Sequence, residues 1–153
     1  MQTNTCSYST KQKSGWFTIE SSRLLVYKLA SFYWANLDHL CIETSGFADN
    51  DLFKSVINKL DYVIMDIKLA DCEKHKKYTG VSNQRILDNL VLADARGTKT
   101  RLRCILINGI NTNEAHYHKI AKIASSLSHC EGVEWIPYHA YGGAKNMFLG
   151  GWD

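Results

Sequence analysis

Ionisable side chains stand in or next to three short apolar segments of this sequence. Asp66 and Lys68 follow a run of valine and isoleucine, Arg103 lies inside a second run, and His139 follows the single proline, Pro137. If these segments are parallel strands, their carboxyl ends meet at one edge of a sheet, where α/β folds place their binding sites. A carboxylate, two cations and an imidazole gathered there would form a site for a small charged ligand.

The period of two in a β-strand decides which of these residues share a face. If the faces concerned look into a barrel, the ionisable groups converge there with their apolar neighbours: Ile64, Asp66 and Lys68; Arg103, Ile105 and Ile107; Val133, Trp135, Pro137 and His139.

A purely structural interpretation of the same residues has equal weight. Charges inside an apolar strand are costly to bury without partners. Asp66 and Lys68 would then neutralise each other, and Arg103 would pair with Glu43. His139 alone is more easily explained as a hydrogen-bonded histidine beside a proline than as a ligand.

The cysteines and the other histidines do not predict a metal site. Five cysteines at wide separations fit neither a disulfide framework nor a close pair of metal ligands. We therefore expect free, reduced thiols and a cytoplasmic protein. His75, His116, His118 and His129 lie in polar or helical segments and match no metal-ligand spacing.

From residue 39 onward, short apolar runs alternate with helical patterns, which is typical of βα units. The sequence predicts an α/β fold: a partial parallel (β/α) barrel of about four strands with intervening helices. The expected strands are 39–45, 62–68, 100–107 and 132–139, and the expected helices are 51–60, 83–96 and 113–127.

Residues 1–38 do not follow this pattern, because their apolar residues repeat with neither strand nor helix period. We expect an atypical leader over 1–38, poorly ordered or read from a shifted frame, followed by a domain over 39–153. A helix over 22–34 has weak support. Unless the leader covers it, the first strand of the domain has an open edge.

Composition excludes some partners. The net charge of +3 comes from lysines spread along the chain, and its one cluster, Lys74, Lys76 and Lys77, is more typical of a solvated face than of a nucleic-acid site. No apolar stretch reaches the roughly 20 residues that span a bilayer. We expect neither nucleic-acid nor membrane binding.

Several blocks in a fixed order resemble the activating enzymes of glycyl radical enzymes, the pyruvate formate-lyase activase type of radical S-adenosylmethionine (SAM) enzyme. The resemblance covers roughly residues 39–145. Its blocks are 41–47 (CIETSGF), 66–68 (DIK), 78–83 (YTGVSN), 86–90 (ILDNL), Arg103 with its strand, 108–111 (NGIN) and 136–139 (IPYH). Each block is weak alone, but the ordered set is fairly specific.

The resemblance implies a [4Fe–4S] cluster on three cysteines, SAM bound to its open iron, and a glycyl radical enzyme as protein partner. By matching positions, six residues would bind SAM: Glu43 and Thr44 near its amino-acid end, Asp66 and Lys68 beside them, Arg103 on an anionic carboxylate and His139 on the adenosine side. These are binding roles, and no residue of this chain is expected to be catalytic.

The sequence departs from the family at the elements that carry its chemistry. The Cys-x3-Cys-x2-Cys loop, the Gly-Gly-Glu segment and the closing C-terminal helix are absent. We therefore expect a fragment of a radical SAM activase, with the cluster ligands missing, that is inactive alone. A reading-frame change just before Cys41 would explain why the resemblance begins near Leu40.

Two other functions remain open. The first is a non-catalytic module that binds SAM or another small anion, or that docks a partner protein. The second is a barrel enzyme such as an aldolase or sugar-phosphate lyase, with Lys68 as a Schiff-base nucleophile.

Overall fold

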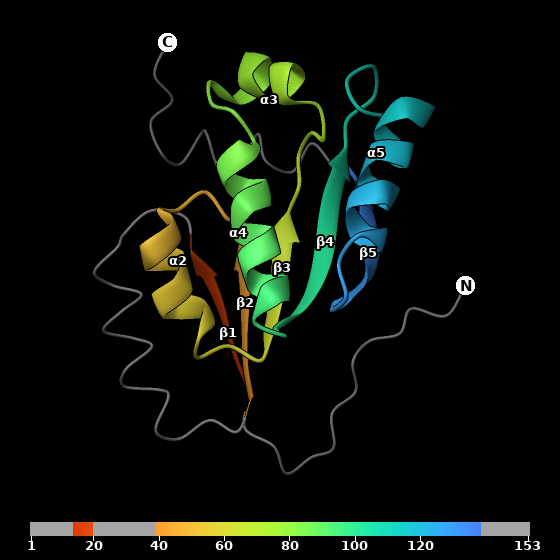
Figure 1. Cartoon of the computed structure of the whole chain (residues 1–153). Helices are drawn as coiled ribbons and strands as arrows, with labels where there is room; N and C mark the ends of the chain where they lie inside the picture. The colour runs from red at the N-terminus through yellow and green to blue at the C-terminus, as the bar shows by residue number, and fades with distance from the viewer. Residues whose placement is uncertain (1–13, 20–38, 139–153) are drawn as a thin grey trace, which may run out of the picture.

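The computed structural model describes residues 14–19 and 39–138. They form a sheet of five parallel strands in the order β1-β2-β3-β4-β5, so each strand lies beside the next along the chain (Figure 1). The strands are β1 (Ser14–Ile19), β2 (His39–Thr44), β3 (Tyr62–Asp66), β4 (Lys99–Leu106) and β5 (Cys130–Pro137).

Helices connect the strands from β2 onward, and three of them cover one face of the sheet (Figure 1). They are α2 (Asn50–Ile57), α4 (Gln84–Ala95) and α5 (Glu114–Ser125). The core lies between these helices and the sheet: Ile42, Val63, Met65, Leu102 and Cys104 from the strands meet Phe53, Ile57, Ile86, Leu90, Ala93 and Ile120 from the helices. The α/β fold with parallel strands predicted from the sequence is confirmed.

A fourth helix, α3 (Cys72–Thr79), lies beyond the carboxyl ends of the strands (Figure 1). The sequence did not predict it, because it has no apolar stripe and His75 is its single buried residue. Its caps define it instead. Asp71 accepts a hydrogen bond from Lys74 N at 3.1 Å, and Gly80 ends the helix with φ of +80°.

The leader contributes a strand, which differs from our expectation that residues 1–38 stay outside the βα pattern. β1 pairs in parallel with β2 along its whole length, from Ser14 opposite His39 to Ile19 opposite Thr44. The edge of β2 that would otherwise be open is therefore paired. The helix expected over 22–34, Cys6, His139 and the tail after it lie outside the described residues.

Within the described part of the chain, no helix is long and apolar enough to cross a membrane.

Candidate functional site

The register brings four of the charged strand residues onto the face of the sheet opposite α2, α4 and α5, which we call the far face. Asp66 on β3 pairs with Arg103 on β4, and Arg103 pairs with Glu134 on β5. Glu43 on β2 is level with Ile64, which shares the face of Asp66. Three of the predicted site residues, Glu43, Asp66 and Arg103, therefore lie on one face of the sheet.

Arg103 forms an ion triad with two carboxylates. Its Nη1 lies 2.9 Å from Glu43 Oε1, and its Nε donates to Glu134 Oε2 at 2.9 Å. Burial alone would lower the pKa of Arg103, but the hydrogen bonds to Glu134 and Glu43 outweigh it and the net shift is upward. The pairing of Arg103 with Glu43, predicted by the structural interpretation, is confirmed. A guanidinium held by two carboxylates does not fit a role as a free clamp for a ligand carboxylate.

The prediction for β5 was wrong about the face. Cys104, which is in the core on the helix side, pairs with Trp135, so Val133, Trp135 and Pro137 point to the helices and not to the side of Arg103. Trp135 packs edge-on against Tyr117 of α5, with ring centroids 5.1 Å apart. Glu134 takes the place on the far face instead. A bulge opposite Thr100 and Leu102 shifts the register, and alternation alone cannot reveal it.

The ammonium of Lys68, unlike the guanidinium of Arg103, is available to a ligand. Its side chain is exposed, and it forms no ion pair within the described part of the chain, so the predicted pairing with Asp66 is not observed. Lys68 lines a cavity of about 300 Å³ at the carboxyl ends of β3, β4 and β5. The cavity is mainly apolar, with Ile105, Ile107 and Ile110 among its lining residues and two tyrosines, Tyr78 and Tyr138, that are half or more exposed.

Thr44 lies at the end of β2 and is occupied in a turn. Its Oγ1 accepts a hydrogen bond from Gly46 N at 3.1 Å. The buried Asn89 of α4 donates to Gly46 O and Ala48 O, each at 2.8 Å, and so fixes the loop that follows. Asn89 lies inside one of the sequence blocks, but the spacing gave no sign that its amide would bind a loop 43 residues away.

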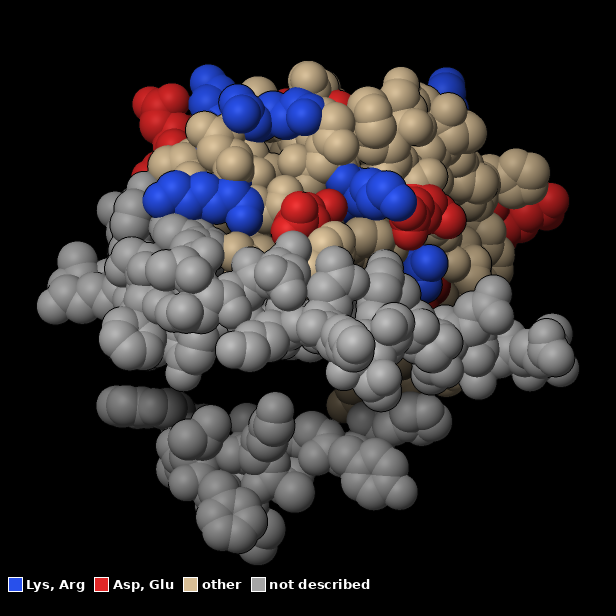
Figure 2. All heavy atoms as spheres, turned by 90° about the horizontal axis from the view of Figure 1, so that it is seen from below, with Lys and Arg blue, Asp and Glu red and all other residues tan. Residues whose placement is uncertain are grey.

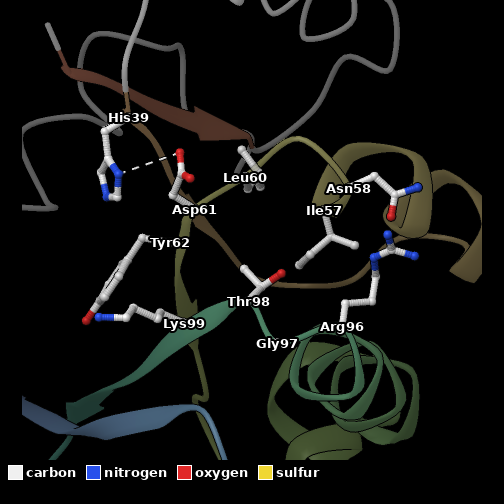
Figure 3. A pocket seen from close by; sticks show the side chains of 10 residues that line it. All are labelled: His39, Ile57, Asn58, Leu60, Asp61, Tyr62, Arg96, Gly97, Thr98 and Lys99. Carbon is white, nitrogen blue, oxygen red and sulfur yellow. Dashed lines mark ion pairs between the residues drawn. The ribbon is translucent and has the colours of Figure 1, made fainter.

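A second cavity, of about 380 Å³, lies at the opposite, amino ends of the strands (Figure 3). His39 and Asp61 face each other across one side, with Nδ1 and Oδ2 3.6 Å apart, and Arg96 and Lys99 come from the other side. Figure 2 shows this end of the molecule, where basic and acidic side chains lie side by side. We place the candidate site at the carboxyl ends, because ligands of parallel α/β folds bind there.

The described cysteines do not fit an iron–sulfur cluster. Cys104 is fully buried on the helix side of the sheet, and burial, followed by the charge of Asp66, raises the pKa of its thiol to about 12. Cys41 alternates with Ile42 and therefore points to the far face. Among the described residues no three histidine, cysteine or acidic side chains could hold one metal ion.

Comparison with known proteins decides between the candidate families. The chain is 40% identical over 115 residues to the isethionate sulfite-lyase activating enzyme of Nitratidesulfovibrio vulgaris, a match that covers 72% of this chain and 36% of that enzyme. It is 35% identical over 115 residues to the 4-hydroxyphenylacetate decarboxylase activating enzyme of Clostridioides difficile, covering 73% and 36%. This chain is related to the C-terminal part of the glycyl-radical-enzyme activating enzymes.

This chain matches only part of the length of these activating enzymes. The chain matches about 36% of the length of the first two relatives, and 46% of the pyruvate formate-lyase 1-activating enzyme of Escherichia coli, to which it is 28% identical over 116 residues. No protein-family model matches the sequence.

The fold agrees with that of a solved activating-enzyme domain. A domain of the pyruvate-formate lyase-activating enzyme from Bacteroides vulgatus superposes with a TM-score of 0.68 at 22% identity, and the match covers 81% of each chain.

Proposed function

We propose that this chain is a SAM-binding C-terminal part of an activase that generates a glycyl radical on a partner enzyme. The observation that supports the proposal is the position of Lys68, which forms no ion pair among the described residues, at the mouth of an apolar, tyrosine-lined cavity at the carboxyl ends of the strands. SAM combines a flat apolar base with a charged amino-acid end, and such a cavity beside a cation is complementary to both parts.

In this proposal the residues of the chain bind and orient. The ammonium of Lys68 attracts the carboxylate of the amino-acid end, while Tyr78, Ile105 and Tyr138 enclose the adenosyl part and exclude water. Arg103 acts indirectly, because its two carboxylate partners occupy its guanidinium. Glu43, whose Oε1 is paired with Arg103, remains a partner of the ligand's amino group by resemblance. His139, on the adenosine side, remains part of the proposal by resemblance.

The cluster does not fit the described residues, so no chemical step is assigned to this chain. The resemblance implies a [4Fe–4S] cluster that would supply the electron for cleaving SAM. A chain without three close thiolates binds SAM without cleaving it, and a separate portion with those cysteines would have to complete the activase. The DNA upstream of Leu40, translated in all three frames, tests whether that portion was lost through a frame change.

Titration calorimetry with SAM and with S-adenosylhomocysteine, its stable analogue without the sulfonium methyl group, tests the binding. We expect both ligands to bind, and Lys68→Gln to weaken both at least tenfold, since a charge-assisted hydrogen bond contributes about 1.5–3 kcal/mol. Lys122→Gln, an exposed lysine of α5 away from the cavity, is the matched control and should change nothing. No heat of binding from the unchanged chain would refute the proposal.

Two alternatives make different predictions. A non-catalytic SAM-binding module shares the prediction that the chain binds SAM and forms no cluster, and it is favoured if the upstream DNA encodes the cluster cysteines in none of its three frames. A Schiff-base enzyme requires a lysine in an apolar, water-excluding environment, whereas Lys68 is exposed. Borohydride trapping of a carbonyl compound on Lys68 would be the result that restores that alternative.

A further inference from the structure

A buried asparagine binds the backbone of Lys68 itself. The side chain of Asn111 is only 1% exposed, and its amide donates to Lys68 O at 3.0 Å and to Ile105 O at 2.8 Å. Its Oδ1 accepts from Ile107 N at 2.6 Å. Both donated protons and the acceptor are therefore used, and the end of β3 is joined to the end of β4 by one side chain.

A second asparagine holds the next two residues of the same segment. Asn83, which is 2% exposed, donates to Leu69 O at 3.0 Å and to Ala70 O at 3.1 Å. Three consecutive carbonyl groups, from Lys68 to Ala70, thus accept hydrogen bonds from two buried amides. We call residues 68–70 the Lys68 segment.

The direction of the Lys68 side chain follows from this backbone. Ile67 and Leu69 on either side are buried, at 2% and 4% exposure, while Lys68 between them is exposed. Ile67 N also donates to Arg103 O at 2.8 Å, so the chain is tied on both sides of Lys68. The fixed backbone thus holds Lys68 in the lining of the cavity, together with Leu69 and Asn111, and Lys68 is the exposed, charged member of these three.

We propose that Asn111 and Asn83 are positioning residues that hold the Lys68 segment so that the Lys68 ammonium is presented at the mouth of the cavity. The identity of the ligand rests on the proposed function. The hydrogen bonds that hold the Lys68 segment do not depend on it. Asn111 acts through the carbonyl of Lys68, and Asn83 acts through the carbonyls of Leu69 and Ala70, so both fix the backbone of the segment.

A role in stability alone is the competing explanation, and Asn89 provides the matched control. Asn89 is fully buried and also donates to two carbonyl oxygens, but those belong to the loop after β2. The change from asparagine to aspartate keeps the shape and removes both donors in each case. Asn111→Asp and Asn83→Asp should therefore loosen the Lys68 segment, whereas Asn89→Asp should loosen the loop after β2.

Backbone hydrogen exchange in the full chain, without ligand, tests the positioning. We expect Asn111→Asp and Asn83→Asp to speed exchange of the Ile67 amide, which donates to Arg103 O next to the Lys68 segment, at least tenfold, and Asn89→Asp to leave it unchanged. Exchange that stays at the unchanged chain's rate in the first two variants overturns the inference, whatever the ligand. If Asn111→Asp does not fold, Asn83→Asp alone decides the point.

The affinity for S-adenosylhomocysteine tests the connection with Lys68. If Asn111 acts through Lys68, Asn111→Asp alone should weaken binding about tenfold. In a chain that already carries Lys68→Gln it should weaken binding less than threefold, because two substitutions that remove the same interaction are not additive. Equal losses in both backgrounds would mean a structural role only and overturn the inference. Absence of binding by the unchanged chain would refute the proposed function, and the exchange rates would still decide the positioning.

Discussion

At the scale of single residues, Gly46 has a conformation that no other residue would adopt without strain. Its φ is +69°, and a Cβ built there would lie 2.9 Å from Sδ of the fully buried Met65. Gly46→Ala should therefore lower the free energy of unfolding by about 1–3 kcal/mol from the backbone strain, with a further loss from displacing Met65. Urea denaturation measures the change.

Gly109→Ala is the control for that measurement. Gly109 has a similar φ of +76°, but nothing lies within 4 Å of the position that the alanine Cβ would take. The variant should show the backbone cost without the steric one. Equal losses at the two positions would show that contact with Met65 has no effect.

His116 should make stability depend on pH. Its side chain is buried, and burial, followed by the charges of Lys74 and Lys119, lowers its pKa in the folded state. The unfolded chain takes up a proton near the ordinary value of about 6.5, so the unfolded state binds more protons and stability falls as pH drops from about 7.5 toward the lowered pKa. Below that pKa this histidine adds no further loss.

Urea denaturation of His116→Phe between pH 7.5 and 5.5 checks this expectation. The variant keeps an aromatic ring against Trp135 and Tyr117 but cannot titrate, so its free energy of unfolding should fall less steeply than that of the unchanged chain. Ser125→Ala, which changes an exposed residue of the same helix that does not titrate, should keep the original slope. A His116→Phe slope equal to the original would exclude His116 as the source.

At the scale of the elements, the triad of Arg103 with Glu43 and Glu134 links three strands. It joins β2 to β4 across β3, and β4 to β5. Arg103→Met should cost about 2 kcal/mol of stability, between the values for exposed and buried pairs, because it leaves two carboxylates without their cation. Adding Glu43→Gln and Glu134→Gln should restore part of the loss in chemical denaturation. A triple variant no more stable than Arg103→Met would contradict this explanation.

The same elements show what could be predicted from sequence. The strands and helices after residue 39 follow hydrophobic periodicity, which reports burial directly, and the pairing of Arg103 with Glu43 followed from the cost of burying charge. α3 was missed because caps define it, not an apolar stripe. Glu134 was missed because a bulge in β5 and the packing of Trp135 decide the face. The amides of Asn83 and Asn111 connect loops that only the folded topology brings together.

At the scale of the whole molecule, β1 covers the edge of β2 and becomes the edge strand on that side of the sheet. β1 pairs with six consecutive residues of β2, and unpaired strand edges promote association with other chains. Five parallel strands in sequential order form an open sheet, so its two edges are not closed on each other as they are in a complete barrel.

Deleting residues 1–38 should therefore destabilise the remaining chain and make it self-associate. The loss should reach several kcal/mol, at roughly 1 kcal/mol for each ladder hydrogen bond, and the β2 edge would be free to pair with a second copy. Light scattering after size-exclusion chromatography, together with urea denaturation, measures both effects. A chain that starts at Ser14 keeps β1 and should match the complete chain. If the chain that starts at His39 is monomeric and as stable as the other two, β1 contributes nothing to the fold, and residues 1–38 are the dispensable leader that their irregular composition predicts.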